Sequence, residues 1–283
     1  MNSSEYSTKL RELPLIRSLS ASAMSGVIDA LLDVSQPATY SDGEPLIKVR
    51  ALGGRDGYVL LAGEVAVHKE GTPDVVVSAP ALLGEMLQFN PRAQRTATVS
   101  AHGPATALKF AWEEFYARLK QRLPAAEQDA VLEAIERSVW ERFGDDTIIK
   151  LSLFAGLPER IRLRASLVLQ SVVERRTLSD GQVLFEQDDF CSATGYIVLR
   201  GAVRVVKTNF PPRIVSAPGI LGVMLRFDPN LQWSAGATAQ GEVELFRFNW
   251  QDYLAILKRR LSEPEMAQFA AAIDSNAPSH FIH

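Results

Sequence analysis

The sequence predicts a mainly β protein with flanking helices, built from two tandem antiparallel β-roll domains of the double-stranded β-helix, jelly-roll-like kind. Two observations lead to this fold class. One is an internal repeat, and the other is a change within each repeat from helical periodicity to short apolar runs broken by turns, and back. We expect an amphipathic helix to join the two domains, which we place at residues 1–145 and 146–283.

The repeat is clearest where residues 77–91 align without a gap with residues 215–229, which lie 138 positions later. Ten of these fifteen positions are identical. The same offset pairs Ser-Asp-Gly at 41–43, Gly-Tyr at 57–58 and Phe-Ala-Trp at 110–112 with matching residues in the second half. A gap-free match of this length indicates a tandem duplication.

Within the first repeat, leucines and isoleucines recur at helical spacing over residues 9–35. Short apolar runs separated by Gly, Pro and Asp then predict strands from Tyr40 to about Leu108. Inside this region, residues 58–61 and 63–68 are expected to form a β-hairpin. Helical spacing returns after Phe110, and a longer helix is predicted from Pro124 to Phe143. Its apolar stripe consists of Val131, Ile135, Val139 and Phe143.

The second repeat follows the same plan. Helical spacing runs from Ile148 to Val173, strands are predicted from Thr177 to Phe246, and closing helices from Trp250 to about Ile273.

Composition predicts a soluble cytoplasmic protein. Apolar residues make up 47% of the chain and charged residues 22%, and no apolar stretch is long enough for a membrane span. The polar N-terminus lacks the apolar core of a secretory signal, and a single cysteine excludes an intrachain disulfide. A net charge of −3 gives no general reason to bind nucleic acid or a membrane surface.

One pair of charged residues distinguishes the two copies. The first contains Gly84-Glu85 and, ten positions after the glutamate, Arg95 followed by Thr96. The second has Val223 and Trp233 in the two charged positions. A carboxylate can accept a hydrogen bond from a sugar hydroxyl, and a guanidinium can bind a phosphate through two parallel donors. The second copy can do neither, and we expect it to be non-binding.

We call the segment from Gly84-Glu85 to Arg95-Thr96 the charged cassette. Together with the strand pattern of residues 178–185 and 195–205, it resembles the cyclic nucleotide-binding domains of the catabolite activator protein and of protein kinase A regulatory subunits. The resemblance implies a site for cAMP or cGMP formed by Gly84, Glu85, Met86, Arg95 and Thr96. In such a site the glutamate binds the ribose, the arginine binds the cyclic phosphate and the threonine hydroxyl contacts the phosphate or the base. Trp140, on the joining helix, is the candidate to cover the base; packing between the two domains is its alternative role.

The resemblance predicts a regulatory protein that passes a signal to a protein partner or to its own oligomer. The alternative is a scaffold in which neither copy binds a nucleotide and Glu85 and Arg95 form a structural ion pair. Two departures from the family pattern, the larger side chains of Ala81 and Leu87, favour this alternative. No nucleophile with a base, phosphate-binding glycine loop or metal-ligand cluster points to an enzyme, and His68 and His102 are isolated. The segment after Leu257 is too short for the winged helix-turn-helix of a transcription factor.

Overall fold

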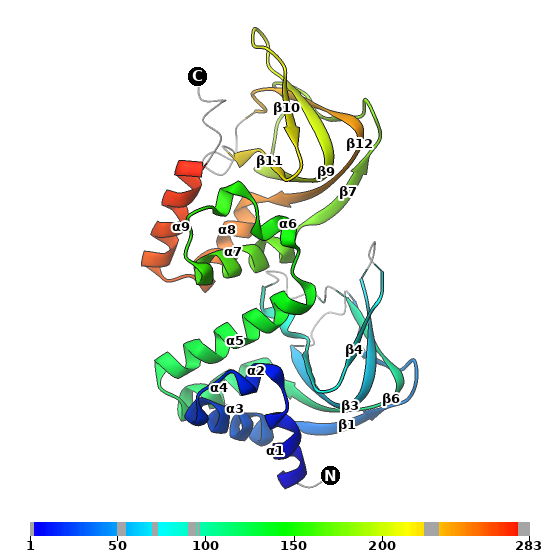
Figure 1. The fold of residues 1–283 in the computed structure, drawn as a ribbon, viewed down its shortest axis with the longest axis vertical. Helices are drawn as coiled ribbons and strands as arrows, with labels where there is room; N and C mark the ends of the chain where they lie inside the picture. Colours follow the sequence, from blue (N-terminus) through cyan, green and yellow to red (C-terminus); the bar gives the residue numbers. More distant parts are fainter. Residues whose placement is uncertain are drawn as a thin grey trace. The chain divides into compact units, whose positions relative to one another are not determined.

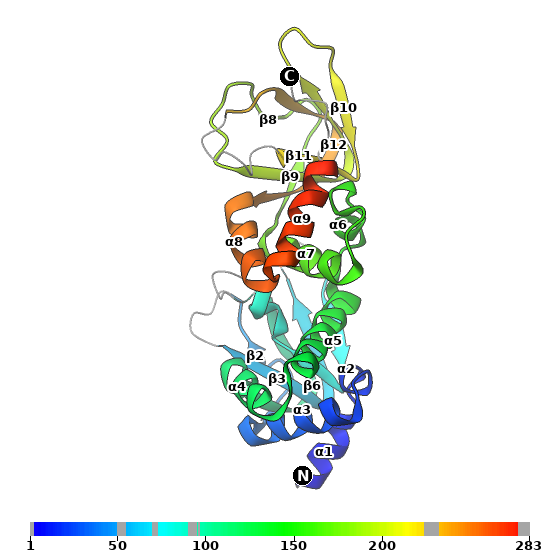
Figure 2. The same ribbon diagram turned by 90° about the vertical axis from the view of Figure 1, so that its left-hand side faces the viewer.

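The computed structural model describes residues 3–49, 55–69, 73–89, 95, 97–223 and 232–276. The chain divides into two compact units, Met1–Phe143 (unit 1) and Gly144–His283 (unit 2). Each contains a rolled antiparallel sheet with helices from both ends of its sequence beside it (Figures 1 and 2). The predicted fold class, mainly β with flanking helices in two tandem β-rolls, is confirmed.

The sheet of unit 1 has the strand order β1-β6-β3-β4, with β2 paired to β6 and β5 paired to β3. All pairings are antiparallel. The strands are β1 (Gln36–Tyr40), β2 (Pro45–Ile47), β3 (Asp56–His68), β4 (Val75–Ser78), β5 (Ala81–Leu83) and β6 (Thr98–Ala111).

Unit 2 repeats this topology with the order β10-β9-β12-β7, with β11 paired to β9 and β8 paired to β12. Even the register is repeated, since Asp56 pairs with Ala111 and, 138 positions later, Thr194 pairs with Asn249. The strands are β7 (Glu174–Leu178), β8 (Val183–Phe185), β9 (Thr194–Val206), β10 (Arg213–Ser216), β11 (Gly219–Leu221) and β12 (Gly236–Asn249).

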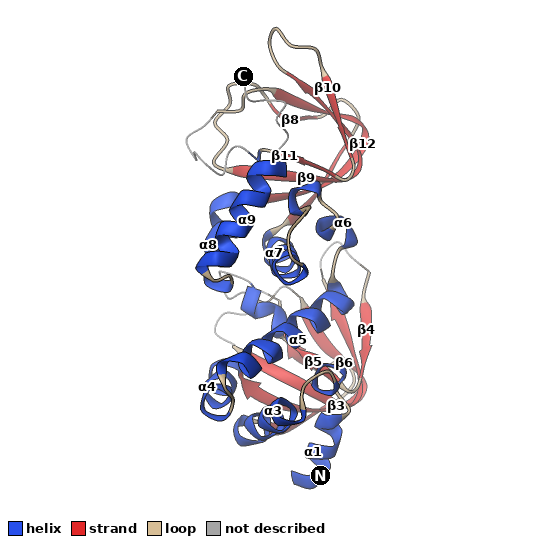
Figure 3. Ribbon diagram, turned by 60° about the vertical axis from the view of Figure 1, so that its left-hand side comes forward, coloured by secondary structure: helices blue, strands red, loops and turns tan. Residues whose placement is uncertain are grey.

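The helices lie beside each roll, as the colouring by secondary structure shows (Figure 3). Those of unit 1 are α1 (Ser3–Arg11), α2 (Pro14–Arg17), α3 (Ala21–Val34), the 3-10 helix η1 (Glu85–Phe89), α4 (Trp112–Arg122) and α5 (Ala125–Phe143). Those of unit 2 are α6 (Asp146–Ile149), the 3-10 helix η2 (Ser152–Phe154), α7 (Glu159–Val172), α8 (Trp250–Arg260) and α9 (Glu263–Asn276).

The predicted hairpin at residues 58–68 is wrong, because β3 is one continuous strand of 13 residues. Both of its halves pair with β6, and the register shifts between them. Gly63 lies at this point with a φ of +84°, and a Cβ added there would lie 2.3 Å from the carbonyl oxygen of Pro104. The glycine therefore bends the strand around its neighbour instead of reversing the chain.

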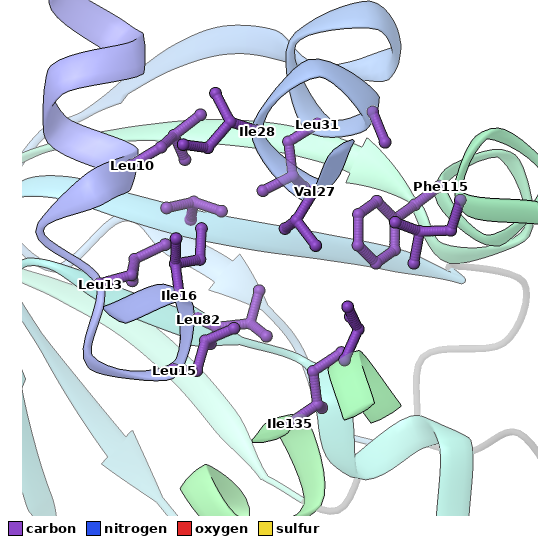
Figure 4. Close-up of a cluster of buried hydrophobic side chains, with 14 of the residues drawn as sticks. Leu10, Leu13, Leu15, Ile16, Val27, Ile28, Leu31, Leu82, Phe115 and Ile135 are labelled. Carbon is purple, nitrogen blue, oxygen red and sulfur yellow. The ribbon is translucent and has the colours of Figure 1, made fainter. Parts of the chain in front are cut away.

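A buried apolar cluster holds the helices of unit 1 against the roll (Figure 4). It joins side chains from α1, α2, α3, α4 and α5 to strands β3, β5 and β6. Among its members are Leu10, Ile16, Val27, Ile28, Leu31, Leu82, Phe115 and Ile135. Leu82 lies in β5, directly before the charged cassette, so the same packing that fixes the helices also fixes the start of the candidate site.

Helix α5 buries the predicted apolar stripe at Val131, Ile135 and Val139, each at most 2% exposed. The side chain of Phe143, the fourth predicted member, lies outside the part of the chain that the structure describes. The helix contacts α2, α3, α4 and η1. It therefore packs along the helices of unit 1 and reaches the cassette with its C-terminal half.

None of the helices among the described residues is long and apolar enough to cross a membrane.

Candidate functional site

The charged cassette begins where β5 ends. Gly84 has a φ of +84°, a conformation that favours glycine, and η1 starts at the next residue. A Cβ on Gly84 would lie 3.0 Å from Arg95 Nη1 and from the carbonyl oxygen of Asp56. The absence of a side chain thus lets the Arg95 guanidinium lie directly against the backbone of the cassette.

Glu85 is 2% exposed and its carboxylate is paired with Arg142 of α5. Nη2 of Arg142 donates to Glu85 Oε1, Nη1 donates to the carbonyl oxygen of Leu82 at 2.6 Å, and Nε to that of Ser138 at 3.2 Å. Burial raises the pKa of Glu85, and the charge of Arg142 opposes that rise. Arg142 therefore connects the long helix to both ends of the segment from Leu82 to Glu85.

Arg95 is 8% exposed and is held by backbone oxygens. Its Nη2 donates to the carbonyl oxygen of Asp56 at 2.6 Å and its Nη1 to that of Gly84 at 3.4 Å. Burial lowers the pKa of Arg95, while Tyr58, Asp56 and Glu85 act in the opposite direction. The alternative prediction of an ion pair between Glu85 and Arg95 is wrong about the partner of Glu85, because its carboxylate pairs with Arg142.

The other predicted site residues differ in how they are placed. Met86 lies on η1 and is half-buried, and Trp140 lies on α5, two residues before Arg142, and is also half-buried. Thr96 lies outside the described residues. Ala81 and Leu87, the two departures from the family pattern, are both buried, at 7% and 9% exposed.

The equivalent positions of unit 2 hold buried aromatic and apolar side chains. Trp233, in the position of Arg95, is 7% exposed and stacks on Phe185, with ring centroids 3.6 Å apart and planes inclined by 10°. Phe185 stands in the position of Ile47, so the loss of the arginine is accompanied by a second, larger side chain. Val223, in the position of Glu85, is buried at 5% exposed. The site that the charged pair occupies in unit 1 is thus apolar core in unit 2.

The backbone around Trp233 is fixed as well. Its N–H donates to the carbonyl oxygen of Asp189 at 2.9 Å, and its own carbonyl oxygen accepts from the N–H of Asp188 at 2.8 Å. These two hydrogen bonds fix the backbone of the residue whose ring stacks on Phe185.

One further pair of equivalent residues differs between the copies. Trp250 donates from Nε1 to the carbonyl oxygen of Gly222 at 2.7 Å. Trp112, its counterpart, is 3% exposed, but its Nε1 is without a hydrogen-bond partner among the described residues. The equivalent sequence positions of the two tryptophans do not reveal this difference, since only the structure shows which donor reaches each glycine carbonyl oxygen.

We expect Trp250→Phe to cost more stability than Trp112→Phe, by about 1–3 kcal/mol. The first change removes a hydrogen bond and leaves the Gly222 carbonyl oxygen without it, whereas the second removes a donor that is already unpaired. Urea unfolding of both variants, fitted with a separate transition for each unit, measures the difference. Equal losses would show that Trp112 does make a hydrogen bond in solution.

The described residues contain no group of three or more His, Cys, Asp or Glu side chains that could hold a metal ion. Cys191, the single cysteine of the chain, is buried.

Comparison with known proteins identifies the family of unit 2. Residues 175–260 match the family model of the cyclic nucleotide-binding domain, a range that spans the roll of unit 2 and helix α8. For unit 2, this match confirms the family resemblance inferred from the sequence. The match falls on the copy that lacks the charged pair. It therefore reflects the strand and helix pattern of the domain and not the charged residues of the candidate site.

Among solved structures, the chain is similar to three regulatory proteins. The regulatory domain of Toxoplasma gondii PKA, crystallised with cAMP, is 18% identical over 95% of this chain and 96% of that one, with a TM-score of 0.36. The regulatory subunit of a cAMP-independent protein kinase A from Trypanosoma cruzi, bound to guanosine, is 15% identical over 97% and 92%, with a TM-score of 0.36. The catabolite activator protein of Thermus thermophilus is 28% identical over 44% and 56%, with a TM-score of 0.35. A search of curated protein sequences finds no significant match.

Proposed function

We propose that unit 1 binds cAMP or cGMP and that unit 2 binds neither, since unit 2 matches the family model of the cyclic nucleotide-binding domain and unit 1 repeats its strand topology. One observation carries the proposal: Glu85 and Arg95 are both buried in the cassette around Gly84, while the equivalent positions of unit 2 are filled by Val223 and Trp233. A buried charge is costly to maintain, so its presence in only one of two otherwise matching frames favours a role that needs it.

The chemistry of the two side chains fits the two ends of the ligand. Arg95 now donates to two neutral carbonyl oxygens, those of Gly84 and Asp56. A cyclic phosphate carries a full negative charge, and charge-assisted hydrogen bonds are roughly twice as strong as neutral ones. The phosphate would therefore compete well for the guanidinium, particularly in a buried setting.

Glu85 would accept a hydrogen bond from the ribose. A carboxylate has two oxygens and about four lone-pair sites. Arg142 occupies one acceptor site, on Oε1, and a backbone N–H uses a second. Acceptor sites of the carboxylate therefore remain for a ribose hydroxyl while the ion pair persists. Trp140 of α5 and Met86 of η1 would line the remainder of the ligand, and the contact of Thr96 stays a prediction from the sequence.

The signal would leave the site through α5, because Arg142 joins this helix to Glu85 and to the carbonyl oxygen of Leu82. A nucleotide that binds better to one pose of the helix than to another would shift the balance between them. The output would be read by a protein partner or by a second copy of this chain in the cytoplasm, and the protein itself would act as a regulator without catalysing a reaction.

The test is isothermal titration calorimetry with cAMP and with cGMP. Arg95→Ala should weaken binding by roughly 10- to 150-fold, the equivalent of about 1.5–3 kcal/mol for a hydrogen bond to a charged group. Arg55→Ala is the matched control, because Arg55 is an arginine of the same unit with 61% of its side chain exposed. Absence of binding heat with either nucleotide, at tens of micromolar protein, would refute the proposal.

The second candidate function is a scaffold that binds no nucleotide. The observation in its favour is that Glu85 and Arg95 already have partners within the chain, Arg142 and two backbone oxygens. A ligand present at a hundred times its Kd adds about 2.7 kcal/mol to folding. A melting temperature unchanged by millimolar cAMP and cGMP would therefore favour the scaffold.

A further inference from the structure

The carbonyl oxygen of the cassette glycine has different donors in the two units. In unit 2 it accepts a short hydrogen bond, 2.7 Å, from Trp250 Nε1. In unit 1 the oxygen of Gly84 accepts two long ones, each 3.4 Å, from the N–H of Leu87 and from Arg95 Nη1. A carbonyl oxygen has two lone pairs, so these two donors use its capacity.

The indole that is left out in unit 1 occupies the same place as its counterpart. The ring of Trp112 lies edge-on to Phe110 at 4.9 Å, and that of Trp250 lies edge-on to Phe248 at 4.9 Å. Both indoles also close the space above an equivalent glycine. A Cβ on Gly57 would lie 2.9 Å from Trp112 Cε2, and one on Gly195 would lie 3.0 Å from Trp250 Nε1. The indole of Trp112 therefore lies over its glycine as that of Trp250 does, but its Nε1 is without a hydrogen-bond partner among the described residues.

What separates the two arrangements is the residue at the arginine position. Arg95 reaches the glycine carbonyl in unit 1, whereas Trp233 in unit 2 stacks on Phe185. Among the described residues of unit 2 no guanidinium reaches the glycine carbonyl oxygen, and the indole of Trp250 donates to it instead. The pair of copies thus shows the same frame with the donor from position 95 present and absent.

We propose a donor exchange at the Gly84 carbonyl oxygen: when an anion binds in unit 1, Arg95 leaves this oxygen and Trp112 donates to it instead. This inference rests on the proposed function, since it assigns the cyclic phosphate as the anion that draws the guanidinium away. Trp112 then donates to Gly84 as Trp250 donates to Gly222, and the first turn of η1 is held from α4 instead of from Arg95. Trp112 is in this sense a positioning residue that touches no ligand.

A first experiment tests the exchange without any ligand. In 15N-labelled protein the indole N–H signals of the four tryptophans are resolved by NMR and assigned with Trp112→Phe and Trp250→Phe. Arg95→Ala removes the competing donor, so the Trp112 indole signal is expected to move towards that of Trp250 and its hydrogen exchange to slow. Arg95→Met keeps more of the side-chain volume and should give the same shift if the alanine variant does not fold. A Trp112 signal that stays at its wild-type position in a folded variant overturns the inference, whatever the protein binds.

A second experiment follows the exchange during binding. Titration with cAMP or cGMP should shift the Trp112 signal in the same direction as Arg95→Ala does, while the Trp250 signal stays in place. Trp112→Phe should bind the same nucleotide roughly 2- to 10-fold more weakly, the worth of one net hydrogen bond, and Trp250→Phe should bind as wild type does. Binding heat without a shift of Trp112 overturns the exchange alone; no binding heat at all counts against the proposed function, while the ligand-free test still decides the exchange.

Discussion

Arg142→Ala is expected to destabilise unit 1 by about 3–5 kcal/mol, the usual loss when one partner of a buried ion pair is removed. Glu85 is 2% exposed and pairs with Arg142, so its carboxylate would be left buried without its counter-charge. Because burial already raises the pKa of Glu85, the variant raises it further. Urea unfolding of unit 1 should therefore show a loss that is largest at high pH and shrinks as the pH falls and Glu85 takes up a proton.

Two controls separate charge from packing in this prediction. Glu85→Val combined with Arg142→Leu removes both charges and should recover much of the lost stability, since unit 2 carries Val223 at the same position. Arg55→Ala breaks an exposed pair with Glu113, whose side chains are 61% and 70% exposed, and should cost less than about 1 kcal/mol. A double variant as unstable as Arg142→Ala would mean that the side chain of Arg142 acts by packing and not by charge.

Trp233→Ala is expected to destabilise unit 2 by about 3–5 kcal/mol, the range for removing a large buried aromatic side chain. The ring is 7% exposed and lies flat on Phe185, with Tyr196 at 6.0 Å between centroids. Its loss leaves a cavity that the hydrogen-bonded backbone around residue 233 prevents from collapsing fully. The unfolding transition of unit 2 should move to lower urea concentration while that of unit 1 stays in place.

The matched control is Trp233→Phe, which keeps a ring on Phe185 and should cost less than half as much. Neither variant is expected to bind cAMP or cGMP in unit 2, because Val223 offers no acceptor for a ribose hydroxyl. Nucleotide binding by the double variant Arg95→Ala/Trp233→Ala, but not by Arg95→Ala alone, would show that unit 2 becomes a binding site once the ring of Trp233 is removed.

Much of the fold was predictable because the chain carries two versions of it. The gap-free match of residues 77–91 with 215–229 predicted equal topologies, and β3, β6, β9 and β12 pair in the same register. The hairpin at residues 58–68 was mispredicted because a glycine between two apolar runs is also the pattern of a turn. Whether such a glycine bends or reverses the chain depends on the strand that pairs across it, here β6, which is far away in the sequence.

The candidate site was predicted only in part. The position of Glu85 and Arg95 followed from their spacing after Gly84, but Arg142 was missed because its contact depends on how α5 packs on the cassette. A signal was present, since Arg142 follows the buried Val139 by three residues and so shares its face of the helix. The filling of the second pocket was also visible in the repeat, as the joint change of Ile47 to Phe185 and of Arg95 to Trp233.

The bend at Gly63 has a consequence for how the two copies could diverge after duplication. Its counterpart Gly201 has a φ of +81°, and a Cβ there would lie 2.4 Å from a backbone oxygen, as a Cβ on Gly63 would lie 2.3 Å from one. A side chain at either position would collide with a backbone oxygen, and a backbone oxygen is present whatever residue stands there. The candidate site, in contrast, is formed by side chains, and there the stacked pair Phe185 and Trp233 of unit 2 stands where unit 1 has Ile47 and Arg95. Inheritance therefore preserved the path of the backbone in both copies and left the chemistry of each pocket free to change.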